Sequence, residues 1–127
     1  MVDCIMLDTS AVIELVKRNN PKILDALKSE MPTAIAISGI TQFELEVGAK
    51  DEEDLKKIRS IPCISADCPA FSIAAHIYAE LKSAGKTPQI KDCFIAAVAI
   101  YNDCLLMTFD RDFGAFEKFG LKTKLLN

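Results

Sequence analysis

The sequence has no long hydrophobic run. Its 127 residues contain no apolar stretch of the length that a membrane-spanning helix needs. Near the N-terminus, Asp3 and Asp8 interrupt the apolar residues and no basic leader precedes them, so no signal peptide is predicted. Repeats, low-complexity segments and obvious linkers are also missing. We therefore expect a soluble, cytoplasmic protein with no membrane partner, folded as a single domain over residues 1–127.

The sequence also has no excess of positive charge, no closely spaced cysteine pair and only one histidine. The net charge is −3, so no overall basic field attracts nucleic acid, and any binding of nucleic acid has to rest on a local patch or on metal ions. The five cysteines are odd in number and form no Cys-x-x-Cys pair, so we predict neither a disulfide framework nor a zinc site. Most of them should be small buried hydrophobes. The single histidine, His76, falls inside a predicted helix and is assigned no role.

The stretch around Asp8 organises the chain. Residues 4–7 are apolar and predict a short buried strand, and the polar step Asp8-Thr9-Ser10 follows directly. These three residue types commonly cap a helix, and from Ala11 onward apolar residues recur with helical spacing. Asp8 is thus predicted where a strand ends and a helix begins, which is the edge of an open α/β sheet at which ligands bind. Taken alone, a capping role explains it better than a functional one.

Predicted strands and helices alternate along the rest of the chain. Further strands are expected at residues 34–37, 61–64, 105–108 and 121–126. Helices are expected at residues 21–30, 40–49, 51–60, 69–84 and 90–101, with a loop and short helical turn at 110–119. In the helix at 69–84 one apolar stripe is predicted, made of Phe71, Ala74, Ala75, Tyr78 and Leu81. The alternation predicts an α/β fold in which helices cover both faces of a mostly parallel sheet.

Acidic residues recur in similar settings. Asp8 and Asp110 follow predicted strands, Glu44 lies in the helix after the second strand, and Asp92 lies in the first turn of the most apolar helix. Each has an ordinary explanation as a cap, a turn residue or a solvated charge. Because parallel strands end at one edge of the sheet, these acids can meet there. Clustered carboxylates repel one another, so a protein that keeps them together usually binds a cation, here Mg²⁺ or Mn²⁺. Such a site activates water for attack on a phosphodiester.

Four ordered motifs resemble those of PIN-domain nucleases, and most closely the small VapC-type toxins. They are Leu7-Asp8-Thr9-Ser10, Phe43-Glu44-Leu45 with Gly48, Asp92-Cys93-Phe94-Ile95-Ala96-Ala97 with Gly85 ahead of it, and Thr108-Phe109-Asp110-Arg111-Asp112-Phe113. The resemblance covers the whole chain in order. It implies a three-layer α/β/α sandwich, a Mg²⁺ or Mn²⁺ site and endoribonuclease activity on RNA. It also implies a homodimer and a cognate antitoxin that blocks the site.

The resemblance also assigns residues. By position, the catalytic and metal-binding acids would be Asp8, Glu44, Asp92 and Asp110, with Asp112 as a further acid at the metal and Thr9 and Thr108 as supporting hydroxyls. Beside these acids, Lys91 and Arg111 are candidates to bind the RNA backbone, whereas Lys86 is interpreted as solvated. We expect the side chains of Thr108 and Asp110 to point in the same direction, because side chains alternate along an extended chain. The turn that follows should take Asp112 away from the edge of the sheet. The exposed apolar residues of the helices at 69–84 and 40–49 would form the dimer contact.

Other functions remain open at this point. An aspartyl-phosphate phosphotransferase also uses an Asp at a strand end, but two residues after Asp8 stands Ser10 and not a second acid. A catalytically silent PIN-fold binding module is disfavoured because all four acids are present. A PIN-fold ribonuclease that processes or surveys RNA without an antitoxin fits the sequence as well as a toxin does.

Overall fold

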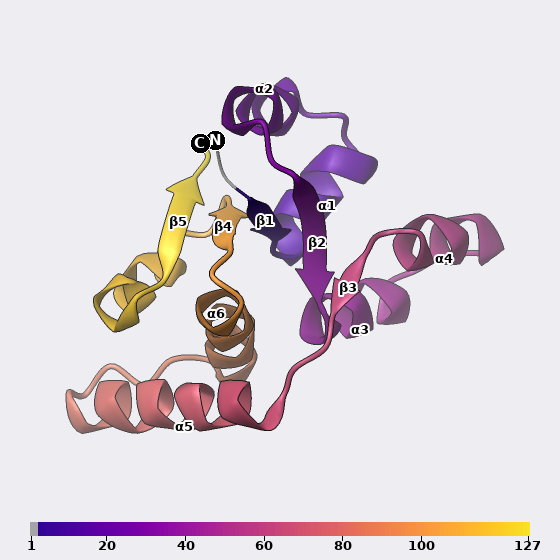
Figure 1. The fold of residues 1–127 in the computed structure, drawn as a ribbon. Coiled ribbons are helices and arrows are strands. Elements are labelled where there is room, and N and C mark those ends of the chain that lie inside the picture. Colours follow the sequence, from indigo (N-terminus) through magenta and orange to yellow (C-terminus); the bar gives the residue numbers. More distant parts are fainter. Residues whose placement is uncertain (1–2) are drawn as a thin grey trace.

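A single parallel sheet forms the centre of the molecule, for which the computed structural model describes residues 3–127. Its five strands lie in the order β3-β2-β1-β4-β5 (Figure 1). They are β1 (Cys4–Leu7), β2 (Ala34–Ser38), β3 (Cys63–Ile64), β4 (Leu105–Thr108) and β5 (Lys122–Leu125). Every strand pair is parallel. The first strand, β1, lies in the middle of the sheet. Strands β2 and β3 are added on one side of it and β4 and β5 on the other, and ligands of α/β sheets bind where the strand order reverses in this way.

Helices cover both faces of the sheet. They are α1 (Thr9–Val16), α2 (Pro21–Glu30), α3 (Gly39–Val47), α4 (Glu52–Arg59), α5 (Cys68–Ser83), α6 (Ile90–Tyr101) and the 3-10 helix η1 (Arg111–Phe119). One apolar cluster joins Met6 and Leu106 to α5, α6 and η1, and a second joins Ile5 and Leu7 to α1–α4 (Figure 1). Alternate residues of β1 thus face opposite layers. The predicted three-layer α/β/α sandwich is confirmed.

Local signals set most element boundaries. Asp8 and Ser38 each end a strand and cap the following helix, accepting a backbone N–H of that helix. Asn20 caps α2, whose first residue is Pro21. After α5 the chain turns through Gly85, whose φ of +76° a residue with a side chain rarely adopts. Within residues 3–127, no helix is long and apolar enough to cross a membrane.

The predicted stripe on α5 is rotated from the observed one. The buried residues are Ala70, Ala74, Ile77 and Leu81. Phe71 is 48% exposed, and its ring packs edge-on against Phe94 of α6 with the ring centroids 5.3 Å apart. The rotation arises because small residues let α5 lie close to α6, and the bulky aromatic rings then occupy the flank of the contact.

The cysteine prediction was wrong in two respects. Cys4 and Cys104 form a disulfide with their Cα atoms 4.8 Å apart. Because Ile5 of β1 pairs with Leu105 of β4, the residue before each lies opposite the other. The two cysteines are 100 residues apart in the sequence, so their pairing cannot be recognised from local spacing. Cys63 and Cys68 are exposed and not buried, whereas Cys93 is buried as expected.

Candidate active site

Asp8 lies at the carboxyl end of the central strand and is almost fully buried, with 4% of its surface exposed. Its Oδ1 accepts hydrogen bonds from the Ala11 amide at 2.9 Å and from Ser10 Oγ at 2.7 Å. Its Oδ2 accepts one from Thr108 Oγ1 at 2.6 Å. Burial raises the pKa of Asp8 above its ordinary value, and these hydrogen bonds oppose that rise. Asp8 therefore caps α1 and also holds the adjacent strand end.

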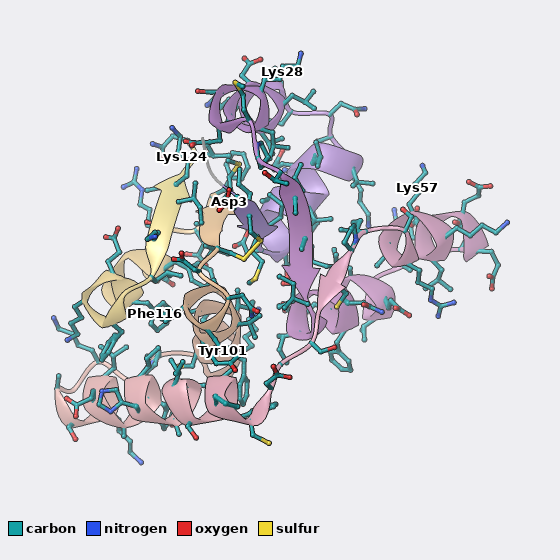
Figure 2. All side chains as sticks on the ribbon, in the orientation of Figure 1. Asp3, Lys28, Lys57, Tyr101, Phe116 and Lys124 are labelled. Carbon is teal, nitrogen blue, oxygen red and sulfur yellow. A yellow bond between two sulfur atoms is a disulfide. The ribbon has the colours of Figure 1, made fainter. Side chains whose placement is uncertain are left out.

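The end of β4 supplies the next acid. The Asp110 amide donates to Thr108 Oγ1 at 2.9 Å, and Asp110 Oδ1 accepts the Asp112 amide at 2.9 Å as the cap of η1. The turn thus begins where the sequence predicted. Asp112 is exposed. Phe113 and Phe116 are buried, and Phe116 lies on the side of η1 that faces α6 (Figure 2).

Glu44 comes from α3 and has a partner on each carboxylate oxygen. Oε1 accepts a hydrogen bond from Thr9 Oγ1 at 2.8 Å, and Oε2 accepts one from Lys91 Nζ at 2.8 Å. Burial acts to raise the pKa of Glu44, but the bonds from Lys91 and Thr9 hold it below its ordinary value. Thr9 thus donates to one of the candidate acids, and Lys91, predicted to contact RNA, is paired with the same acid.

Asp92, in the first turn of α6, is 8% exposed. Its pKa is raised from the ordinary 3.8 to about 6, mainly by burial and next by the negative charge of Asp110. Asp112 and Asp8 contribute smaller rises to this value, and Lys91 opposes them. Acids from three separate segments therefore act on one another across this edge of the sheet.

The chemistry of these groups fits a hard divalent cation. Carboxylates with nearby hydroxyls are the oxygen donors that Mg²⁺ and Mn²⁺ prefer. Among residues 3–127, however, no three acids lie close enough to one another to form a ready-made metal-binding group. Asp8 and Glu44 are both hydrogen-bonded to donors of the protein itself. A divalent cation would have to exchange with those donors.

A cleft of about 560 Å³ opens beside Asp92. The loop after α5 and the start of η1 line it, and both Lys86 and Arg111 contribute to its wall together with Asp92 and Asp112. Arg111 thus lies on the same cleft wall as Asp92 and Asp112. Lys86, interpreted from the sequence as a solvated charge, lies there too.

Sequence reasoning also passed over Ser10. Its hydroxyl donates to Asp8 Oδ1 at 2.7 Å and accepts the Phe109 amide at 3.2 Å. It therefore joins the ends of β1 and β4. The sequence places Ser10 in the polar step after the first strand and in the Leu7-Asp8-Thr9-Ser10 motif, but this pattern assigns its hydroxyl no role of its own.

Comparison with known proteins identifies similar sequences and similar folds. A model of the PIN domain family matches residues 5–118. Ribonuclease VapC3 of Methanocaldococcus jannaschii is 34% identical over 93 residues, covering 73% of this chain and 95% of that protein. VapBC2 from Rickettsia felis, solved bound to a promoter DNA fragment, superposes with a TM-score of 0.79 at 21% identity, over 98% of this chain and 99% of that one. VapBC-5 from Mycobacterium tuberculosis, a member of the VapBC family of toxin-antitoxin systems, superposes with a TM-score of 0.69 at 23% identity, over 98% of each chain. The family match includes every acid of the site described above.

Proposed function

This chain belongs to the PIN-domain family, and from that premise we propose that it is a metal-dependent endoribonuclease acting as the toxin of a VapBC-type toxin–antitoxin pair. The observation that carries the proposal is geometric: Asp8 and Asp110 follow adjacent strands and are joined through Thr108, and the buried Asp92 lies near them, where their negative charges raise its pKa. A protein retains such repulsion where a cation balances it. The similarity to a protein named as a ribonuclease favours RNA as the substrate.

In this proposal Asp8, Glu44, Asp92 and Asp110 hold Mg²⁺ or Mn²⁺, and Asp112 lies further out. The bound ion would lower the pKa of a water molecule and stabilise charge that develops on the phosphodiester. The protein's own contribution is orientation. Thr108 bridges the segments of Asp8 and Asp110, and Thr9 fixes the Glu44 carboxylate. Such partners determine how firmly metal ligands are placed.

The RNA backbone is proposed to pass along the cleft beside Asp92. Arg111 offers a planar guanidinium that can bind phosphate oxygens through two hydrogen bonds. Lys86, on the same wall, adds a second cation. The net charge of the chain is negative, so binding has to rest on this local pair and on the metal.

The activity can be tested directly. With Mn²⁺ or Mg²⁺, purified protein is expected to cut single-stranded RNA internally, because an activated water attacks the phosphodiester, and to leave 5′-phosphate ends. EDTA should stop cleavage, and added Mn²⁺ should restore it. Asp8→Asn is the matched control, since asparagine can still cap α1 but lacks the charge. RNA that stays intact at every metal concentration, together with an acyl-phosphate formed from a phosphodonor, would replace the nuclease proposal with a phosphotransferase.

A cognate antitoxin and a second copy of this chain are the proposed protein partners. The fold shared with a VapBC complex supports the antitoxin. For the homodimer we propose the exposed apolar residues of α3 and α5, above all Phe43, which is 67% exposed, and Phe71, which is 48% exposed. A short open reading frame directly upstream would support the toxin over a ribonuclease that works without an antitoxin.

The assembly prediction can be measured by light scattering. The wild type is expected to be a dimer at micromolar concentration. The double change Phe43→Ser and Phe71→Ser should shift it to the monomer, because it removes two large apolar contacts. Leu24→Ser on α2, a residue 39% exposed, serves as the control and should leave the mass unchanged. A wild-type monomer would count against a stable dimer.

A further inference from the structure

Each oxygen of the Glu44 carboxylate accepts a hydrogen bond from one of this chain's own donors, and a role as a metal ligand does not explain the donor on Oε2. Thr9 Oγ1 and Lys91 Nζ each lie 2.8 Å from one of its oxygens. The pair with Lys91 joins α3 to α6 across 47 residues of sequence. The Lys91 ammonium therefore reaches Glu44 from the other helical layer of the fold, and Lys91 directly precedes Asp92 in the sequence.

The location of Lys91 is unfavourable apart from this contact. It is the second residue of α6, at the helix end that carries partial positive charge, where a cation loses stability relative to an acid. Its side chain is 48% exposed, and that of Glu44 is 24% exposed. An ion pair this accessible contributes little to the stability of a fold. Stability alone is therefore a weak reason for a lysine at this position.

We propose that Lys91 is a positioning residue that acts as the internal counter-ion of Glu44 and competes with the divalent cation for that carboxylate. The inference rests on the proposed function. The Lys91 ammonium, 2.8 Å from Oε2, occupies one direction from which a metal ion can approach Glu44 and repels a second cation there, so Glu44 becomes a better ligand when the ammonium moves away. Lys91 therefore weakens metal binding, and it neutralises the charge of Glu44 when no metal ion is bound.

Calorimetric titration of the full chain with Mn²⁺ tests the competition. Lys91→Met keeps an unbranched, flexible side chain, one atom shorter than lysine, and removes the charge. It is expected to bind Mn²⁺ about fivefold more tightly, a factor at the upper end for an accessible ion pair. Lys91→Arg keeps the pair and should bind as the wild type does. Lys57→Met removes a charge on α4, far from Phe116 and the cleft, and serves as the control (Figure 2). This control should change the affinity less than twofold.

A double-mutant cycle distinguishes the pair from a general loss of positive charge. In a Glu44→Gln background, Lys91→Met should no longer tighten Mn²⁺ binding, because the carboxylate for which the two cations compete is gone. Equal or weaker binding by Lys91→Met, or a gain that survives in the Glu44→Gln background, would overturn the inference and leave the metal site standing. Absence of Mn²⁺ binding in the wild type and in every variant would overturn both the inference and the proposed metal dependence.

Discussion

Asp92→Asn is expected to abolish RNA cleavage and at the same time to stabilise the protein at pH 7.5. The cleavage is lost because the variant lacks one charged ligand of the proposed metal site. The stability is gained because the wild-type carboxylate is buried and faces the negative charges of Asp110, Asp112 and Asp8. Asparagine keeps the shape of the side chain without the charge, so the fold itself is preserved.

The sign of the pH dependence follows from the raised pKa. The ordinary pKa of 3.8 applies in the unfolded chain and about 6 applies in the folded one, so between these values the folded state binds more protons. The free energy of unfolding therefore falls as pH rises from about 4 to about 6 and stays low above that. The penalty at neutral pH is about 1–3 kcal/mol, and Asp92→Asn removes it.

Urea unfolding in EDTA, measured from pH 4 to pH 8, checks this expectation. The fall in stability between pH 4 and pH 6 should be smaller in Asp92→Asn than in the wild type. Added Mn²⁺ should stabilise the wild type more than the variant, since a ligand stabilises only the state that binds it. Asp25→Asn, an exposed acid on α2, is the control and should alter neither cleavage nor stability. Normal cleavage by Asp92→Asn would remove Asp92 from the catalytic set.

Local chemistry made much of the fold predictable. Strand β1 and helix α6 were placed with the observed bounds because the first is a short apolar run before a polar step and the second is apolar nearly all round. The shared edge was predictable for the same reason. Two parallel strands ending in polar residues must bring those residues together, and Thr108 indeed donates to Asp8 across 100 residues of sequence.

Pairings that depend on register or on helix rotation were not predictable. The disulfide between Cys4 and Cys104 requires β1 to pair with β4 in one particular register. The buried face of α5 depends on how closely it approaches α6, which its own periodicity does not encode. The partner of Lys91 depends likewise on where α3 lies relative to α6, so a lysine beside a site acid could equally have faced RNA.

Asp110→Asn is expected to reduce cleavage far more than Asp112→Asn does. Asp110 follows β4 directly and its amide is bonded to Thr108, whose hydroxyl is bonded in turn to Asp8. Among the charges that act on Asp92, that of Asp110 raises its pKa most, and that of Asp112 has a smaller effect. Asp112 is exposed at the start of η1. On this basis we propose Asp110 as the direct metal ligand and Asp112 as a residue that supports the site from outside.

Single-turnover cleavage of one RNA at saturating Mn²⁺ separates the two acids. Asp112→Asn should lose about 10–100-fold in rate, as partners of metal ligands typically do, and should still cut measurably. Asp110→Asn should be inactive, yet it should retain η1, because asparagine caps a helix nearly as well as aspartate does. Circular dichroism of both variants checks that the loss of activity is not a loss of structure. An inactive Asp112→Asn beside an active Asp110→Asn would mean that the metal reaches past the end of β4 into η1, and that the hydrogen bond from Thr108 serves only to shape the turn.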